Sequence, residues 1–373
     1  MVDSSKTVFK ALIAALVVFA FPAGAPGAEP SPWPWMPKEN VLTIPTGPDN
    51  RRNSEGDFVI LGDGTILCVY AHYYGSAGDD HATACLMSRL STDGGDTWTA
   101  ADKLEVGNEG GRNVTSVSLL RLADGRVAMF YLVTESSEDC RPYMRVRRDD
   151  GTWGERKCLI DKPSYNVVNN DRVVQLSSGR ILVPVARHDY LGKDKYDYEA
   201  NAHTYCLISD DGGETWREGG ALEPIEGVIY QEPGLCELAD GRILMNVRTD
   251  SHAQYFAYST DGGQTWGPAF KSCIDSPRSP TLIKRLPGSD ELLAIGNPYL
   301  PIPGSNDRVT MTIERLTPDG GEILVRKTME HPQRQMNVDW MYPAVCFLGD
   351  GTALVGYFCG PGAYIYKINL SDL

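Results

Sequence analysis

A short turn phrase recurs six times along the chain, and it constrains the fold more than any other feature. Its clearest copy is "LADGRIL" at Leu238, and successive copies begin 48 to 62 residues apart, at Leu61, Leu122, Leu176, Leu238, Leu286 and Leu348. In most copies an Asp-Gly or Ser-Gly pair stands between β-rich runs, and such pairs favour the positive φ angles of a two-residue hairpin. Periods of this length are typical of a β-propeller with about four short strands per blade. The sequence therefore predicts an all-β, six-bladed β-propeller.

A second phrase falls one hairpin later in the repeats. It reads "STDGGDTW" at residues 91–98, "SDDGGETW" at 209–216 and "STDGGQTW" at 259–266, with less regular copies at 147–153 and 316–322. The Asp side chain can accept hydrogen bonds from amides of its own turn, and the Trp is suited to packing between strands. We interpret this phrase as a structural turn.

The N-terminal region indicates a signal peptide, followed by a strand that completes the last repeat. The N-terminus has the order of a secretory signal peptide: Lys6 and Lys10, then an apolar run at 11–21, then small residues up to Ala28. We therefore expect residues 1–28 to be removed and the protein to be secreted or periplasmic; an uncleaved anchor is the alternative. Residues 29–373 then form one propeller domain. The last repeat is one strand short, and the segment at 40–45 is expected to supply that outer strand and close the ring. No later run is long and apolar enough to span a membrane.

The composition limits which partners, metals and cofactors we expect. A formal net charge of -14 over 373 residues would repel a phosphate backbone, so nucleic acid is not an expected partner. The nine cysteines form no CxxC pairs and show no metal-ligand spacing, and several lie in strand-like runs. We expect buried core cysteines, with no metal and no cofactor. The sequence does not indicate the oligomeric state.

Strand direction sorts the polar residues by face. If the four strands of a repeat alternate in direction, the two turn phrases lie on one face. The starts of the first and third strands and the ends of the other two lie on the opposite face. Six unusual polar residues fall on that opposite face: Arg52, Asp80, Glu232, Arg248, Arg308 and Tyr342.

This set suggests a defined chemistry. Three guanidinium groups around one point would clamp a carboxylate or phosphate. Asp80 can act as a general acid, and Glu232 beside Tyr342 can accept the phenol proton so that the oxygen becomes a nucleophile. A neutral nucleophile suits a substrate whose reacting carbon carries its own carboxylate, because a carboxylate nucleophile would be repelled there.

With these residues in order, the chain resembles the exo-α-sialidase (neuraminidase) family with Asp-box (BNR) repeats. Asp80 precedes the first Asp-Gly-Gly phrase by 11 residues, Glu232 precedes Arg248 by 16, and Tyr342 follows Arg308 by 34, which is similar to the family's spacing. The resemblance implies a retaining hydrolysis of terminal α-linked sialic acid, with sialylated glycans as partners. By the same resemblance, Asp80, Tyr342 and Glu232 are the catalytic residues, and the substrate carboxylate is bound by Arg52, Arg248 and Arg308.

Some alternatives stay open. The family's first arginine stands in an Arg-Ile-Pro phrase, whereas this chain reads "RRNSEGD", so Arg51 competes with Arg52. Glu55 has no counterpart in that phrase and could reshape the pocket around the carboxylate. The reaction could be transfer in place of hydrolysis, as in a trans-sialidase, or the propeller could bind an acidic glycan without turnover. Less specific candidates on the same face, for sugar contacts or for contacts between blades, are Asn170, Asp171, Arg172, His188, Asp189, Arg278 and His81.

Overall fold

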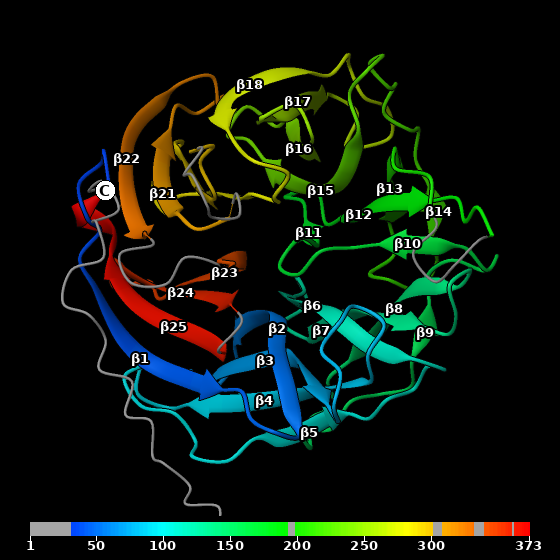
Figure 1. Cartoon of the computed structure of the whole chain (residues 1–373), viewed down its shortest axis with the longest axis vertical. Helices are drawn as coiled ribbons and strands as arrows, with labels where there is room; N and C mark the ends of the chain where they lie inside the picture. The colour runs from blue at the N-terminus through cyan, green and yellow to red at the C-terminus, as the bar shows by residue number, and fades with distance from the viewer. Residues whose placement is uncertain (1–30, 193–197, 301–307, 332–338, 360–361) are drawn as a thin grey trace, which may run out of the picture. The chain divides into compact units, whose positions relative to one another are not determined.

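Five sheets of mainly antiparallel strands, arranged around a common centre, make up the described part of the chain from Ser31 to Leu373 (Figure 1). The computed structural model describes residues 31–192, 198–300, 308–331, 339–359 and 362–373. The expected signal peptide at 1–28 lies outside the described residues. The chain in the described ranges is all-β, apart from one short 3-10 turn, η1 (Leu370–Asp372).

Three four-stranded sheets are each built from consecutive strands. The first has the order β2 (Asn50–Ile60), β3 (Ile66–Tyr74), β4 (Ala84–Ser91), β5 (Lys103–Val106). The second has the order β15 (Tyr230–Glu237), β16 (Ile243–Thr249), β17 (Ala253–Ser259), β18 (Phe270–Asp275). The third has the order β19 (Leu282–Arg285), β20 (Leu292–Gly296), β21 (Met311–Leu316), β22 (Ile323–Glu330).

A fourth four-stranded sheet joins the two ends of the propeller domain. Its order is β1 (Lys38–Pro45), β25 (Gly362–Asn369), β24 (Thr352–Cys359), β23 (Met341–Phe347). Strand β1 runs antiparallel to β25, from Lys38 opposite Ile368 to Pro45 opposite Gly362. The segment at 40–45 therefore supplies the outer strand of the last repeat, and Figure 1 shows β1 in blue beside β25 in red.

The second and third repeats share one nine-stranded sheet, so the structure has four separate four-stranded sheets where the sequence predicts six. The strands are β6 (Asn113–Arg121), β7 (Val127–Thr134), β8 (Cys140–Val146), β9 (Lys157–Cys158), β10 (Tyr165–Val167), β11 (Val174–Gln175), β12 (Ile181–His188), β13 (His203–Ser209) and β14 (Arg217–Glu218). Strand β10 joins the two repeats because it pairs antiparallel with β12 and also lies parallel to β8, with Tyr165 opposite Cys140. The sheet count therefore differs from the prediction.

The two turn phrases occupy the hairpins that the sequence indicates. Each "LADG" phrase joins the first and second strands of its repeat, and each Asp-Gly-Gly phrase precedes the last one. In the first Asp-Gly-Gly turn, Asp93 accepts hydrogen bonds from the amide of Thr97 (2.9 Å) and the hydroxyl of Ser91 (2.8 Å). Hydrogen bonds from Thr97 and Ser91 lower the pKa of Asp93 to about 2.

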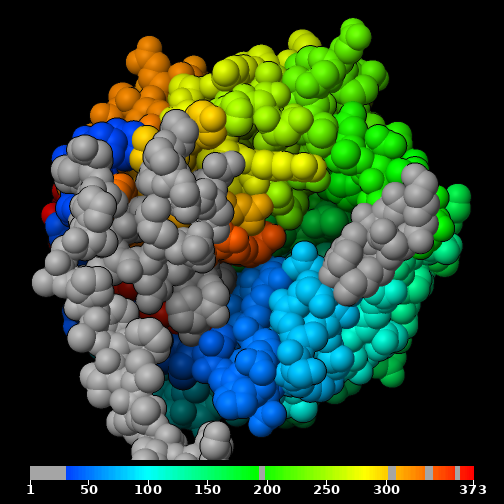
Figure 2. Space-filling view, viewed as in Figure 1, coloured from blue at the N-terminus to red at the C-terminus, as the bar shows by residue number. Residues whose placement is uncertain are grey.

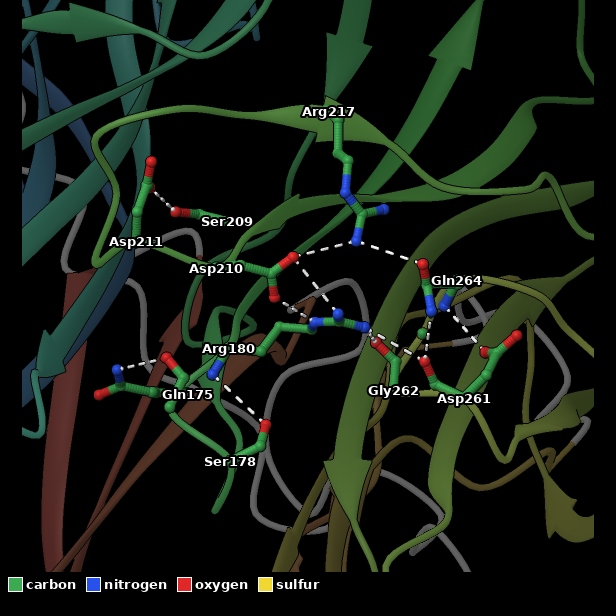
Figure 3. Close-up of polar contacts among 12 residues, drawn as sticks. Gln175, Ser178, Arg180, Ser209, Asp210, Asp211, Arg217, Asp261, Gly262 and Gln264 are labelled. Atoms are coloured by element: carbon green, nitrogen blue, oxygen red, sulfur yellow. Dashed lines mark hydrogen bonds and ion pairs between the residues drawn. The ribbon is translucent and has the colours of Figure 1, made fainter.

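These turns also connect neighbouring sheets, as Figure 3 shows for Arg180. Arg180 lies in the third "LADG"-type hairpin and donates through Nε to Asp210 (2.6 Å), in the Asp-Gly-Gly phrase of its own sheet. It also donates through Nη1 to the carbonyls of Asp261 (3.1 Å) and Gly262 (3.0 Å), in the corresponding phrase of the next sheet. These contacts agree with a structural role for the phrase.

The core lies between adjacent sheets. Val69 and Leu86 pack in one cluster with Val114 and Met129 of the next sheet, and all four are fully buried. Burial of one such side chain stabilises the fold by about 1.5–3 kcal/mol. Six of the eight cysteines with described side chains are buried and all eight are free thiols, as expected for core residues. Among the described residues, no helix has the length and apolarity needed to cross a membrane.

Candidate active site

Two adjoining cavities open where the inner strands begin, and the surface in Figure 2 is hollowed near its centre. The inner pocket has a volume of about 110 Å³, and Glu55, Ser116, Asp80, Glu232 and Tyr342 are among its lining residues. The outer pocket measures about 420 Å³ and shares Asp80 and Glu232 with the inner one. The three residues predicted to be catalytic therefore line one cavity.

β-Bulges direct several side chains into the inner pocket. The pairing register shifts between Ser54 and Asp57 in β2, and between Met341 and Ala344 in β23. Within these two bulges, Glu55 and Tyr342 adopt positive φ angles of 53° and 54°. A bulge changes the direction of a side chain, and non-glycine residues with positive φ are strained conformers that cluster at functional sites. The backbone is thus shaped to present Glu55 and Tyr342 to the pocket.

The phenol of Tyr342 is held neutral. Burial raises its pKa above the ordinary value, and the negative charges of Glu232 and Glu55 raise it further, while the charge of Arg308 lowers it. The phenol therefore needs a base that accepts its proton before the oxygen can attack. Glu232 is the predicted base, and it lines the same pocket.

Arg248 and Glu232 form a tight ion pair. The guanidinium Nη1 of Arg248 lies 2.5 Å from Oε2 of Glu232, and both side chains are largely buried. They come from adjacent antiparallel strands, β16 and β15, and Gln231 next to Glu232 is paired with Arg248 in the register. This contact fixes the orientation of the carboxylate at the pocket wall.

Arg52, and not Arg51, contacts residues of the inner pocket, although Arg52 does not line either pocket itself. Arg51 is exposed, whereas Arg52 donates to Asp80 (2.5 Å) and to Glu55 (2.6 Å), and its guanidinium lies 4.7 Å from the centre of the Tyr73 ring. Two carboxylates therefore share the charge of this arginine.

Glu55, which the sequence indicates only as a residue that could reshape the pocket around the carboxylate, lines the inner pocket. Its Oε2 accepts a hydrogen bond from the hydroxyl of Ser116 (2.6 Å). Burial raises the pKa of Glu55, and the charge of Arg52 and the Ser116 hydrogen bond oppose this rise. The available signal was the Arg-x-x-Glu spacing of the RRNSEGD phrase, but only the bulge brings Glu55 into the pocket.

Arg308 approaches the same region from the segment before β21. Its Nη2 donates to the carbonyl of Arg278 (2.8 Å), and its own carbonyl accepts from the amide of Trp340 (3.0 Å), two residues before Tyr342. The buried amide of Asn297 donates to the Trp340 carbonyl as well (2.9 Å). Arg308 does not line either pocket itself.

The segment at 170–172 lies in the buried centre, so its side chains make contacts between sheets and not with a sugar. Asp171 pairs with Lys284 (2.6 Å) and accepts from the amide of Val345 (2.9 Å). Arg172 is 2% exposed. Asn170 donates to the carbonyls of Tyr342 (3.2 Å) and of Gly56, the residue after Glu55 (2.8 Å). One buried amide thus joins the bulges that carry Tyr342 and Glu55.

The outer pocket has an aromatic wall that the sequence does not reveal. The rings of Tyr165 and Tyr198 stack with centroids 4.1 Å apart, and His81 stacks on Tyr165 at 6.1 Å. The guanidinium of Arg112 contacts Nδ1 of His81, and Nδ1 of His188 lies 2.8 Å from the carbonyl of Glu199. Within the described ranges, no group of three or more His, Cys, Asp or Glu side chains has an arrangement that could hold a metal ion.

Comparisons with known proteins bear on the repeats and the fold of the chain. The sequence matches the family described as "BNR repeat-like domain" over residues 64–355. It is 30% identical over 177 residues to a sialidase of Micromonospora viridifaciens, covering 45% of this chain and 25% of that protein. It is 26% identical over 233 residues to a sialidase of Clostridium perfringens, covering 56% of this chain and 58% of that one. The chain thus spans less than two thirds of either relative.

The fold is similar to that of a leech intramolecular trans-sialidase. The superposition has a TM-score of 0.70 and covers 90% of this chain and 71% of the leech protein, at 14% sequence identity. At such identity the likeness shows a common propeller arrangement of sheets and does not extend to activity.

Proposed function

We propose that this chain, which belongs to the sialidase family with BNR repeats, is an exo-acting retaining glycoside hydrolase. Its substrates are sialylated glycans and glycoconjugates, from which it releases terminal α-linked sialic acid or a related nonulosonic acid. The observation that carries the proposal is the presence of Tyr342, Asp80 and Glu232 in the wall of one pocket.

In the first step, the phenol oxygen of Tyr342 bonds to the anomeric carbon and its proton passes to Glu232. Asp80 in its acid form donates a proton to the leaving oxygen as the glycosidic bond breaks. In the second step, Asp80 accepts a proton from water, whose oxygen bonds to the anomeric carbon as the bond to Tyr342 breaks. The phenol then recovers its proton from Glu232. Two displacements at one carbon retain its configuration, and sialidases with a Tyr nucleophile depart from the two-carboxylate scheme in this way.

The substrate carboxylate would be bound by Arg52, Arg248 and Arg308. A guanidinium offers a planar fork of donors, and a charge-assisted hydrogen bond in a sheltered pocket is stronger than a neutral one. Arg248 is held by Glu232 and Arg52 by Glu55 and Asp80, so their orientation is set before the substrate arrives.

Two finer points belong to the same proposal. We count the nine-stranded sheet as two blades joined by β10, which gives six blades in agreement with the six turn phrases. We also infer export from the cell, to a secreted or periplasmic location, from the signal-like order of residues 1–28.

A fluorogenic α-sialoside tests the proposed hydrolysis. The mature protein is expected to release the fluorophore, and Tyr342→Phe and Asp80→Ala are expected to lose at least about 100-fold in kcat, given the contribution of such groups. Tyr258→Phe is the matched control, because this tyrosine donates to the Asp319 carbonyl (2.7 Å) beside an Asp-Gly-Gly turn, away from the pockets.

Binding and product analysis distinguish the hydrolase from a glycan-binding propeller and from a trans-sialidase. Binding of the sialoside by wild type without any release would refute the hydrolase and favour a glycan-binding propeller. Transfer of the sugar to an added acceptor, in place of water, would identify a trans-sialidase.

A further inference from the structure

The outer pocket contains an arginine that the proposed reaction does not use. Arg278 lines this pocket together with Arg248, Asp80 and Glu232. Its Nε donates to the side-chain oxygen of Gln231 (3.0 Å), and no ion pair of Arg278 is present among the described residues. This exposed guanidinium thus faces the pocket without forming an ion pair, although the carboxylates of Asp80 and Glu232 line the same pocket.

The turn that carries Arg278 is buried and fixed. Ser276 and Ser279 on either side are fully buried, and the amide of Gln254 donates to the Ser276 hydroxyl (3.0 Å) and to the Ser279 carbonyl (2.9 Å). The carbonyl of Arg278 itself accepts from Arg308 (2.8 Å). The backbone of Arg278 is therefore anchored while its side chain is exposed, and such preorganisation lowers the entropic cost of binding a ligand.

The aromatic wall of the same pocket comes from a different sheet. Tyr165 and Tyr198 form a stacked pair whose interplanar angle is 29°, next to the ring of His81. A tyrosine ring has a large apolar surface, which can pack against the apolar face of a sugar ring. The pocket thus offers both an aromatic surface and a cation.

The position of Asp80 indicates which part of the substrate enters this pocket. Asp80 lines both pockets, and as the acid it must lie beside the oxygen of the leaving group. If the reacting sugar lies beside Tyr342 with its carboxylate on Arg248, it sits at the junction of the two pockets. The sugar attached to it then extends past Asp80 into the rest of the outer pocket.

On the basis of the proposed function, we propose that the outer pocket binds the second sugar of the glycan and that Arg278 recognises an anionic group on it. The anionic group is a carboxylate, as in a second sialic acid, or a sulfate ester. The neutral ring packs on Tyr165 and Tyr198, and the anion accepts hydrogen bonds from the Arg278 guanidinium. The preferred substrates are then glycans with two neighbouring acidic groups.

Binding is measured in a Tyr342→Phe background, so that turnover does not consume the ligands. The probes are α2,3-sialyllactose, its 6-sulfated form and an α2,8-linked disialyllactose, which present a neutral, a sulfated and a carboxylated second sugar. Arg278→Met is compared with Arg285→Met, which removes an arginine at the end of β19 beside a separate cavity. Arg278→Lys retains the charge and replaces the methionine variant if that one does not fold.

Arg278→Met is expected to weaken binding of the two acidic probes about 10-fold or more and of sialyllactose less than about 2-fold, as for loss of a charge-assisted hydrogen bond. Arg285→Met should change none of them, and Arg278→Lys should give an intermediate loss for the acidic probes. A stronger effect on one acidic probe identifies sulfate or carboxylate as the recognised group.

Equal weakening of all three probes, or no preference of the parent for acidic probes, would overturn the assignment of Arg278. A separate outcome concerns the reaction. If wild type hydrolyses no sialoside while the Arg278-dependent preference persists, the proposed function fails and the binding assignment stands.

Discussion

The side-chain amide of Asn170 donates to the backbone carbonyl of Tyr342 at 3.2 Å, and so ties the centre of the ring to the strand that carries the phenol. The same amide reaches the carbonyl of Gly56 at 2.8 Å, beside Glu55. Because Tyr342 and Glu55 both have positive φ, their strained backbone depends on such contacts to persist.

Asn170→Ala should therefore reduce kcat on a fluorogenic sialoside by about 10-fold or more, because small displacements of a reacting group are costly. Asn246→Ala removes another buried amide, which donates to the Thr281 carbonyl (2.9 Å), and it serves as the control. Both variants should lose a similar free energy of unfolding. Equal kcat values for the two would show that Asn170 does not position Tyr342.

The protonation state of the Tyr342 phenol can be measured by ultraviolet absorbance. Its pKa is raised by burial and by the charges of Glu232 and Glu55, so no phenolate of Tyr342 should form below the ordinary tyrosine pKa of about 10. The ultraviolet absorbance of wild type minus that of Tyr342→Phe, followed across a pH titration, measures this group alone. A phenolate signal already present near neutral pH would contradict activation by Glu232.

The first Asp-Gly-Gly turn offers a matched pair of glycines. Gly95 has φ of 87°, and a Cβ there would lie 2.8 Å from Cδ2 of Leu354 in the last sheet. Gly94 has φ of 73°, but a Cβ there would meet only the Lys367 amine, at 4.0 Å. Gly94→Ala should cost about 1–2 kcal/mol of unfolding free energy from left-handed strain, and Gly95→Ala about 1–3 kcal/mol more from overpacking. Urea unfolding measures both, and equal costs would exclude a steric role for Leu354.

The raised pKa of Glu314 predicts that the free energy of unfolding depends on pH. It is buried in β21, with an oxygen 2.6 Å from Nε of Arg326, and burial raises its pKa to about 7 from 4.5, although Arg326 opposes the rise. Because the folded chain holds this proton more tightly than the unfolded chain, the contribution is full below pH 4.5 and is lost as the pH rises through about 7.

Relative to Glu314→Gln, wild type should lose roughly 1–3 kcal/mol of unfolding free energy between about pH 4.5 and pH 7.5. Denaturant unfolding of both proteins at several pH values measures the difference. Glu322→Gln, at an exposed position just before the next strand, should leave the profile of wild type unchanged. A pH-independent difference would mean that Glu314 is ionised throughout.

The repeated turn residues allowed much of the fold to be predicted from the sequence. Gly residues with positive φ, such as Gly125 and Gly241, occur in the "LADG" hairpins that define the repeats. The alternating direction of the strands predicts that Asp80, Glu232 and Tyr342 lie on one face, and all three line the inner pocket.

What the sequence could not reveal depends on local departures from regular strands. Glu55 enters the pocket only because a bulge interrupts the side-chain alternation of β2, and the direction of the strand does not predict a bulge. Tyr165 and Tyr198 stack although 33 residues separate them, and neither belongs to a turn phrase. The nine-stranded sheet arises from a single parallel residue pair, Tyr165 with Cys140, which no repeat pattern indicates.

The pairing of β1 with β25 has a consequence for how the protein matures. Lys38 pairs with Ile368, so nearly the whole domain has to be synthesised before β1 and β25 can pair and close the ring. Contacts between such distant residues form slowly, because a long loop must be closed first. Until then the edge of β24 that β25 covers is open to pairing with other chains. The last step of folding is therefore also the step at which a newly synthesised chain is most exposed to aggregation.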